Sequence, residues 1–483
     1  MEREIPQAPG ALPLLGHLPS FVLNPLKFLD ALPASGNLVR LRWGSQSVVM
    51  VCDPHLTREV LLDDRKFDKG GPLHSAITGV VPHGLVTCRH DVHRRQRRLC
   101  QPSFRNDRFD GYARAMVAAA YETADSWRAG QVVHVRRDIA ELTLRTAVDT
   151  MFSAELSPAT TRQLVDDMSS LVATFFRWSI SPPLLRRLPT PGNLRFTKAI
   201  ERLKRTVAEV IAARRADGSA GTDQGDLLSA MIGTVDTADA VDTEGPDRDA
   251  GFCDQELVDQ VLNFFVAGGE TTAGALVWAL DLVGRHPEIE ERLLAEADAV
   301  VGGDPLEFRH VAKLDLATRV INEALRMYPP VWVMPRIVET DTELGGVHLP
   351  AGTMLAVSPY VVHQKPGLYE NPERFDPDRW LDGPKDRATF IPFGSGARSC
   401  IGGSFAMAEA VLTLTALMAR WKLVPVSAKP PRPSVGVTLS GRGMRMKVLP
   451  REPRPAAATG YAEARPTAPD ETASEAGSGC PYH

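Results

Sequence analysis

A single cysteine lies in a glycine-rich loop, FGSGARSCIGG at residues 393–403, with glycines on both sides of Cys400. From about Ser404 the chain continues in an amphipathic helical pattern, so we expect the thiol at a helix N-terminus, where unpaired N–H groups and the helix dipole favour a thiolate. Arg398 places a cation in the same neighbourhood. The glycines permit positive φ angles and the close approach of a flat ring. An isolated thiolate of this kind is typical of an axial ligand to haem iron.

A second candidate site lies inside a long helical pattern, predicted over residues 254–287 with Asp254 as its cap. The centre of this pattern is apolar on every face, which is typical of a buried helix. Its middle nevertheless reads Gly268-Gly269-Glu270-Thr271, and both glycines and a buried carboxylate cost stability there. Two interpretations stay open. One is a groove beside a proton-handling acid and hydroxyl; the other is a close helix crossing, with Glu270 in a salt bridge.

The spacing Phe393-x-x-Gly396-x-Arg398-x-Cys400-x-Gly402 resembles the ligand loop of the cytochrome P-450 superfamily, the haem-thiolate monooxygenases. The resemblance extends over about residues 8–450. It implies that Cys400 binds the iron of haem b, and that O2 and electrons derived from NAD(P)H are consumed. It also implies that the cofactor is contacted by Phe393, Gly394 and Gly402.

The middle of the long helix matches a second motif of this superfamily, as Ala267-Gly268-Gly269-Glu270-Thr271. The superfamily places this motif over the oxygen side of the haem. The resemblance therefore implies that Thr271 hydrogen-bonds dioxygen, that Glu270 helps to deliver protons, and that Ala267 contacts the cofactor.

Glu323 and Arg326 match the Glu-x-x-Arg motif of the superfamily, which implies a structural triad behind the haem. Taken alone, an i,i+3 ion pair on a helix is commonplace. A downstream arginine completes the triad, and spacing to the cysteine favours Arg379 in PDRW over Arg374 in PERF.

The segment HRRQRRLCQPSF at residues 93–104 resembles the helix that holds the haem propionates, with His93 and Arg97 one turn apart. Arg336 and Arg398 match two further propionate-binding arginines, and cations suit buried carboxylates. The other arginines of the segment form either a solvated basic face or a docking surface for an acidic electron donor. No flavin or nicotinamide fingerprint follows, so the resemblance implies ferredoxin and ferredoxin reductase as partners.

Three apolar segments, at residues 73–86, 171–178 and 329–335, are candidate walls of a pocket for a small hydrophobic substrate. The candidate pocket residues are Ile77, Val80, Val81, Phe175, Phe176, Val331, Trp332 and Val333. The alternative for each of them is that it fills the core. Stretches such as DDRKFDKGGP and RLPTPGNLRF resemble the actinobacterial sesquiterpene-oxidising branch of the superfamily. This resemblance implies hydroxylation of a methyl group on a tricyclic sesquiterpene, with alcohol-to-aldehyde oxidation as an open further step.

Two other readings of the substrate and activity stay open. The same chemistry can act on a fatty acid, a steroid or a macrolide. A haem-binding sensor without turnover is the alternative from another class, although a sensor needs no proton relay such as Glu270-Thr271.

The elements that position these residues are mostly helical. Residues 37–54 alternate like a β-hairpin, helical periodicity dominates from about Thr57 to Leu282, and strand-like pieces return at 337–358 and 434–448. We therefore expect a mainly α fold with a small β portion, as a single cytochrome P-450 domain over residues 36–450. The haem is expected between the long central helix and the cysteine loop. Residues 1–35 are predicted to be an irregular proline-rich lead-in and 451–483 a disordered tail.

The overall composition narrows the class of protein. The 483 residues carry 55 basic and 59 acidic side chains, a formal charge of −4, so nucleic acid is not an expected partner. No apolar run is long enough for a membrane anchor. The six cysteines form no CxxC pair, which favours a reducing compartment, and we expect a cytoplasmic bacterial protein.

Overall fold

The computed structural model describes residues 4–44, 46–152, 156–180, 186, 188–216, 223–234, 251–384 and 386–451. Its helices are α1 (Leu18–Leu23), α2 (Pro25–Ala31), α3 (Pro54–Leu62), α4 (Pro72–Thr78), α5 (His90–Cys100), α6 (Phe109–Ser126), α7 (Val135–Phe152), α8 (Pro158–Ile180), α10 (Pro191–Ala216), α11 (Leu227–Ile232), α12 (Asp254–Arg285), α13 (Pro287–Val301), α14 (Asp315–Met327), α15 (Pro359–Gln364) and α16 (Gly403–Arg420). Short 3-10 helices include η6 (Pro377–Trp380) and η7 (Gly396–Arg398).

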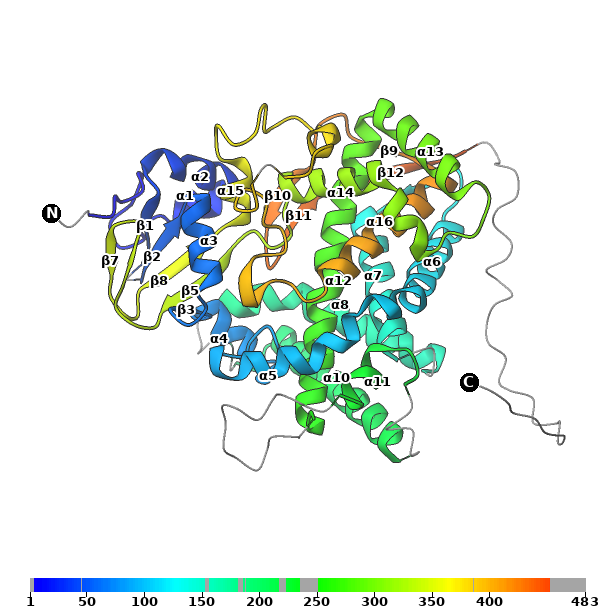
Figure 1. Cartoon of the computed structure of the whole chain (residues 1–483), viewed down its shortest axis with the longest axis horizontal. Helices are drawn as coiled ribbons and strands as arrows, with labels where there is room; N and C mark the ends of the chain where they lie inside the picture. Colours follow the sequence, from blue (N-terminus) through cyan, green and yellow to red (C-terminus); the bar gives the residue numbers. More distant parts are fainter. Residues whose placement is uncertain are drawn as a thin grey trace, which may run out of the picture.

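The strands are β1 (Leu38–Trp43), β2 (Gln46–Val51), β3 (Phe67–Asp68), β4 (Val132–Val133), β5 (Met334–Val338), β6 (Thr342–Leu344), β7 (Val347–Leu349), β8 (Met354–Val357), β9 (Trp421–Pro425), β10 (Arg432–Val435), β11 (Leu439–Arg442) and β12 (Met446–Pro450). Five strands form the largest sheet, in the order β1-β2-β8-β5-β3. Strands β4, β12 and β9 form a second sheet, and β10 pairs with β11 and β6 with β7. The larger sheet lies at one side of the molecule, and most of the helices form the rest together with the smaller sheets of β9–β12, as Figure 1 shows.

The predicted hairpin is confirmed as β1 and β2, which pair antiparallel from Leu38 opposite Val51 to Trp43 opposite Gln46. Successive side chains of a strand point to opposite faces of the sheet. Leu38 accordingly joins one hydrophobic cluster and Val39 another, so both faces of this sheet are covered. The expected mainly α fold with a small β portion is confirmed.

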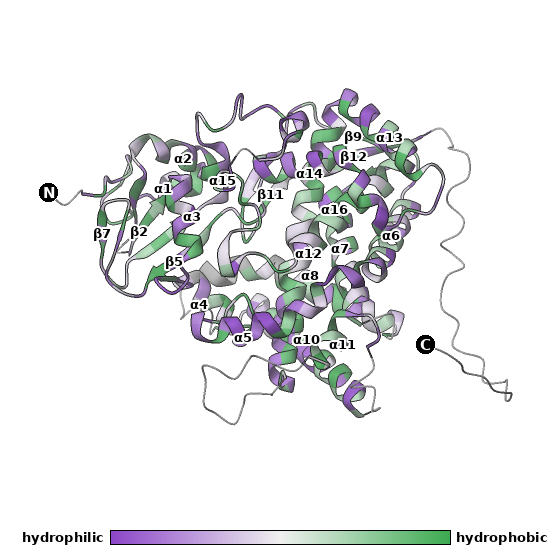
Figure 2. Cartoon of the chain, in the orientation of Figure 1, coloured by the Kyte–Doolittle hydropathy of each residue, from purple (hydrophilic) through white to green (hydrophobic). Residues whose placement is uncertain are grey.

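Helix α12 runs through the middle of the helical part (Figure 1) and is buried along most of its length. Its indole at Trp278 stacks on Tyr328, with ring centroids 3.7 Å apart. Helix α5, by contrast with the buried α12, is largely hydrophilic, as Figure 2 shows. The predicted cap was wrong by one position: Cys253 is the N-cap, and its backbone N–H donates to the Glu256 carboxylate at 3.1 Å. The Cys253 side chain in turn faces the backbone N–H of Glu256. This capping box satisfies N–H groups that a helix start leaves unpaired.

The segment predicted as an irregular lead-in contains regular structure. It forms α1, α2 and a 3-10 helix at Leu32–Ser35, and Ile5 and Ala8 are buried. The prediction of a disordered tail concerns residues that, from 452 onward, lie outside the described part of the chain. Among the residues that the structure describes, no helix is both long and apolar enough to cross a membrane.

A buried carboxyl lies in the core between three helices. Glu409 of α16 is 2% exposed. Burial raises the pKa of this carboxyl from 4.5 to about 8, against the opposing effect of the Thr272 hydroxyl on α12 and the Thr146 hydroxyl on α7. Glu409 is therefore protonated at neutral pH, and its ionisation destabilises the fold.

The Glu409→Gln variant should remove a pH dependence of stability. Because the folded protein holds this proton more tightly than the unfolded chain, the stabilisation is complete below about pH 4.5 and is lost as the pH rises to about 8. The shift corresponds to up to about 5 kcal/mol. We expect the free energies of unfolding of the two proteins to converge at low pH and the glutamine variant to be the more stable above pH 8. A constant difference across urea titrations at several pH values would contradict this account.

Candidate active site

The cysteine loop is a closed turn between the sheet and α16. The Cys400 backbone N–H donates to Phe393 O at 2.8 Å, which brings the two ends of the loop together. Gly394 and Gly396 both have φ of +71°, as expected for a turn that needs glycine. A Cβ at Gly396 would lie 2.5 Å from Leu61 O, so the loop also packs tightly on the end of α3. Gly402 has φ of −90° and is not one of the left-handed glycines.

The thiol of Cys400 lies just before α16, as predicted. Cys400 is exposed, yet the protein around it is dense enough that burial raises the pKa of its thiol. The Gly402 N–H and the guanidinium of Arg97 lower that pKa, so the helix start and one cation do favour the thiolate. The cation is not the expected one, because Arg398 turns away from the sulfur. Arg97 instead lies at the loop, where its Nη1 donates to Ser399 O at 2.6 Å.

The middle of α12 presents a solvent-accessible stripe inside an otherwise buried helix. Phe264, Ala267, Gly268 and Thr271 are partly exposed at the spacing i, i+3, i+4, i+7, so they share one face. A Cβ at Gly268 would meet nothing within 4 Å. The Thr271 hydroxyl donates to Ala267 O at 2.7 Å. This face therefore opens onto free space beside a threonine hydroxyl.

The two glycines differ in what surrounds them, and the packing of each matches a different one of the two interpretations. Gly268 faces the open space, whereas a Cβ at Gly269 would lie 2.4 Å from Leu144 Cδ2, which marks the close crossing of α12 with α7. The Thr143 hydroxyl donates to Gly269 O at 2.7 Å at the same crossing. The groove and the crossing thus occupy opposite sides of one short stretch.

Glu270 has partners from two distant segments. Its Oε1 accepts a hydrogen bond from the Thr438 hydroxyl at 3.1 Å and lies 3.6 Å from Arg136 Nη2. Burial raises the pKa of the Glu270 carboxyl, while Thr438 and Arg136 lower it. A carboxyl that is destabilised as an anion and partly restabilised by two donors is suited to taking up and releasing a proton.

Three cations, Lys69, Arg97 and Arg398, lie around His93 and form the cation cluster of this site. His93 is 2% exposed, and its Nδ1 has no hydrogen-bond partner among the described residues. Burial and the charges of Arg398, Lys69 and Arg97 lower the pKa of His93 to about 3, so the imidazole is neutral. Arg336 is also buried, and within the described part of the chain its guanidinium donates only to Pro335 O.

Arg398 is already paired with carboxylates. Its Nε donates to Asp64 at 2.9 Å, its Nη2 to Asp68 at 2.7 Å and its Nη1 to Cys88 O at 2.7 Å. The sequence pattern placed Arg398 with the propionate-binding residues, but its guanidinium faces these acids. The two acids anchor the cysteine loop to the segment around β3.

Glu323, Arg326 and Arg379 come together behind the loop. The Arg326 guanidinium donates two hydrogen bonds of 2.9 Å to Glu323, and both side chains are 0% exposed. Arg379 Nε donates to Glu323 Oε1 at 3.3 Å, whereas Arg374 is exposed. Of the two candidate arginines, Arg379 is therefore the one that contacts Glu323. Trp380 Nε1 adds a further hydrogen bond to Glu323, at 3.0 Å.

Phe104 links the loop to the central helix. A Cβ at Gly402 would lie 3.5 Å from its ring. The same ring packs edge-on against Phe264 of α12, with centroids 5.3 Å apart, and against Phe405 of α16 at 6.5 Å. The exposed thiol and the accessible stripe therefore belong to one region of the molecule, and Arg97 joins it to the cations around His93.

Comparison with known proteins identifies the family of the chain. The model of the Cytochrome P450 family matches residues 6–446. This chain belongs to the cytochrome P-450 family. It is 38% identical over 451 residues to pentalenene oxygenase of Streptomyces avermitilis, covering 92% of this chain and 97% of that protein. It is also 38% identical to cyclooctatin synthase of Streptomyces melanosporofaciens, covering 92% and 95%.

A solved structure supports the same assignment. The haem domain of cytochrome P450DA superposes with a TM-score of 0.81 at 25% identity, over 94% of this chain and 99% of that one. The chain is thus a haem-thiolate monooxygenase that uses O2 and electrons from a reductant. The expected single-domain cytochrome P-450 fold is confirmed.

The residues of this cytochrome P-450 fit a haem. The isolated, exposed thiol of Cys400 would bind the haem iron, and a Cβ at Gly268 on α12 would meet nothing within 4 Å, so this face could accept a flat ring. The buried His93 Nδ1 has no hydrogen-bond partner among the described residues, and the buried Arg336 guanidinium donates only to the neighbouring Pro335 O, so both have hydrogen-bonding capacity left for the carboxylates of a propionate edge.

The candidate pocket residues divide into core and accessible positions. Val80, Val81 and Phe175 are buried in the main hydrophobic cluster, against which Ile77 packs. Trp332 is buried too, stacked on Phe21 with its indole N–H donating to Gly436 O, so this residue fills the core of the hydrophobic cluster that contains Val39. Val331 is 37% exposed and Val333 half-buried. The side chain of Phe176 lies outside the described residues.

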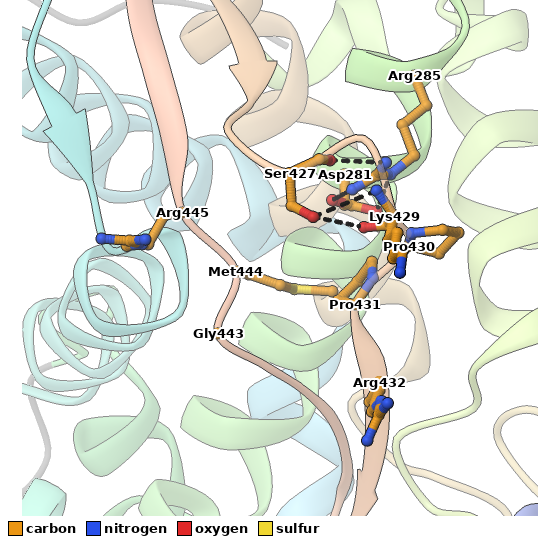
Figure 3. A pocket seen from close by; sticks show the side chains of 10 residues that line it. All are labelled: Asp281, Arg285, Ser427, Lys429, Pro430, Pro431, Arg432, Gly443, Met444 and Arg445. Atoms are coloured by element: carbon orange, nitrogen blue, oxygen red, sulfur yellow. Dashed lines mark hydrogen bonds and ion pairs between the residues drawn. The ribbon is translucent and has the colours of Figure 1, made fainter.

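A surface cavity beside η6 is lined by the triad residue Arg379 together with Tyr369 and Trp380, and another cavity lies away from the predicted site residues. The latter, of about 420 Å³, is lined by the end of α12 and the chain around β10 and β12. Figure 3 shows Arg285 engaged by Asp281 there, while Arg432 and Arg445 lie apart from one another. None of the predicted site residues lines this cavity, and its cations do not converge on a common point.

Sequence reasoning missed the partners of Arg398 and Glu270. Asp64 and Asp68 hold Arg398, and Arg136 and Thr438 hold Glu270. None of the four lies within a recognisable motif. The only signal was the run DDRKFD, whose acids stand close to a buried strand.

Proposed function

We propose that this cytochrome P-450 hydroxylates an unactivated C–H bond of a hydrophobic terpenoid, most similar to the sesquiterpene pentalenene, with electrons from ferredoxin. The observation that carries the proposal is the accessible stripe of Phe264, Ala267, Gly268 and Thr271 on a buried helix. It offers an apolar surface with a single hydroxyl, which suits a hydrocarbon substrate without ionic groups.

Each site residue has its own role in this proposal. The Cys400 thiolate binds the iron, and His93, Arg97 and Arg336 hold the propionates. When bound, the haem supplies oxygen activation and the oxidation of the C–H bond. The carboxyl of Glu270 gives its proton toward the Thr271 hydroxyl and takes another from water. The Glu323–Arg326–Arg379 triad keeps the loop in position.

The substrate class rests on two kinds of support. The proteins named pentalenene oxygenase, cyclooctatin synthase and cyclooctat-9-en-7-ol 5-monooxygenase are each 38% identical to this chain. The accessible face of α12 carries no charged side chain other than the half-buried Glu270 near its edge. Oxidation of the first alcohol onward to an aldehyde is part of the proposal.

The electron source is argued from the surface. The exposed Arg94 and Arg98 lie on α5, the helix whose Arg97 contacts the cysteine loop. A basic face next to the ligand loop complements an acidic ferredoxin and speeds its association.

Incubation with pentalenene, a ferredoxin, its reductase and NADPH tests the proposal. We expect products carrying one added oxygen, followed by an aldehyde, and a substrate-induced spectral shift that pentalenene gives but fatty acids, steroids and macrolides do not. The Thr271→Ala variant should bind pentalenene equally well and form little product. A shift confined to one of the other substrate classes would overturn the terpene assignment, and wild-type binding without any product would favour the sensor.

A further inference from the structure

The turn between β10 and β11, residues 436–438, lies against the acid of α12. Thr438 is 3% exposed, and its hydroxyl donates to Glu270 Oε1 at 3.1 Å. The other partner of the same oxygen, Arg136, lies at 3.6 Å and has a side chain that is 56% exposed. The carboxylate is therefore held from the inside by a buried hydroxyl and from the outside by a surface arginine.

Three further hydrogen bonds fix this turn in place. Leu439 N donates to Pro330 O at 3.0 Å, and Trp278 of α12 donates from its indole to Leu439 O at 3.3 Å. Trp332 donates from its indole to Gly436 O at 3.0 Å. Because backbone atoms of the turn are tied both to α12 and to the segment after α14, the Thr438 hydroxyl has a defined position.

The two partners of Glu270 differ in what they can do. An exposed arginine at 3.6 Å contributes little, because solvent screens the pair and the long side chain is mobile. A buried hydroxyl that donates to a carboxylate stabilises the anion and restricts its rotation. Thr438 is therefore the partner that determines where the Glu270 carboxyl points.

We propose that Thr438 is a positioning residue for proton delivery, which orients the Glu270 carboxyl toward Thr271 and links that orientation to the loop at Pro330–Trp332 through the β10–β11 turn. The inference rests on the proposed role of Glu270. The carboxyl gives its proton toward the Thr271 hydroxyl and regains one from water on the Arg136 side, so the carboxyl ends each turnover in its starting state.

Without the Thr438 hydroxyl, we expect the carboxyl to rotate toward Arg136 and the solvent. Proton delivery beside Thr271 then falls behind electron delivery. NADPH and O2 are consumed with hydrogen peroxide formed in place of hydroxylated product, while substrate binding is unaffected.

The test compares Thr438→Val, which keeps the shape and removes the hydroxyl, with Thr438→Ser, which keeps the hydroxyl. We expect Thr438→Val to lower product per NADPH about tenfold, to raise the solvent deuterium isotope effect on kcat and to leave KM unchanged. Thr438→Ser should restore the coupling. A raised KM with normal coupling, or equal losses in both variants, would overturn the proposal. Thr438→Ala supplies the same measurements if the valine variant does not retain haem.

Two further variants separate this inference from the proposed function. Glu270→Gln should lose coupling to the same extent, and adding Thr438→Val to it should cause no further loss, because the two residues act through one carboxyl. If Glu270→Gln is fully coupled, the proposed relay fails and the inference with it. If Glu270→Gln is uncoupled and Thr438→Val is not, only the inference fails. Arg136→Gln should change coupling less than twofold or so; a loss equal to that of Thr438→Val would make Arg136 the orienting partner.

Discussion

Replacing Cys400 with serine is expected to abolish product formation and the red-shifted Soret band of the reduced, carbon monoxide-treated protein. A hydroxyl of ordinary pKa cannot replace a thiolate as the electron-donating ligand, and thiolate donation is what favours O–O cleavage. The effect should be all-or-none, because no other described cysteine lies in the glycine loop. The carbon monoxide difference spectrum and the product assay measure it directly.

Cys253→Ser is the matched control. The residue is exposed and caps α12, where serine is a favoured N-cap, so the same substitution should leave the spectrum intact and the fold at least as stable. A thiolate-type spectrum that survives in Cys400→Ser would show that another sulfur, or none, binds the iron.

Arg326→Met is expected to lower the free energy of unfolding by about 3–5 kcal/mol and to reduce haem retention. Arg326 and Glu323 are fully buried and share two hydrogen bonds of 2.9 Å. The methionine leaves Glu323 in the core with Arg379 as its nearest cation, and Arg379 makes only one hydrogen bond of 3.3 Å to it. Urea unfolding and haem content during purification measure the two effects.

Arg374→Met provides the contrast, because Arg374 is exposed and belongs to the literal PERF sequence. Its effect on unfolding should stay within about 0.5 kcal/mol. If Arg374→Met destabilised the protein as much as Arg326→Met, the assignment of Arg379 to the triad would be wrong.

The parts of the fold that local sequence determines were predictable. The continuous apolar pattern at residues 254–287 became α12 at Asp254–Arg285, and the alternation around Trp43 became the β1–β2 hairpin. The lead-in was not predictable, because its order depends on distant contacts. Ala8 N, for example, donates to Arg40 O at 3.0 Å, which places the first residues along the edge of the sheet.

In the candidate site, too, the residues within short motifs were predictable and their distant partners were not. Cys400, Thr271 and the Glu323–Arg326 pair lie in short motifs, so spacing alone was enough to single them out. The partners that set their electrostatics lie far away in the sequence. Thr438 is 168 residues from Glu270, and Asp68 is 330 residues from Arg398. A hydroxyl or a carboxylate in a loop carries no signal of which buried group it will meet, so these contacts became visible only in three dimensions.

The double glycine of α12 separates two tasks that usually compete, tight packing of a scaffold and free volume for a ligand. A methyl group at position 269 would collide with Leu144, whereas one at position 268 would project into unoccupied volume. Enlarging residue 268 would therefore reduce the volume that the haem and a substrate share on this face of α12 without disturbing the α7–α12 crossing, so a variant at this position should change haem content before it changes the size of molecule that is accepted.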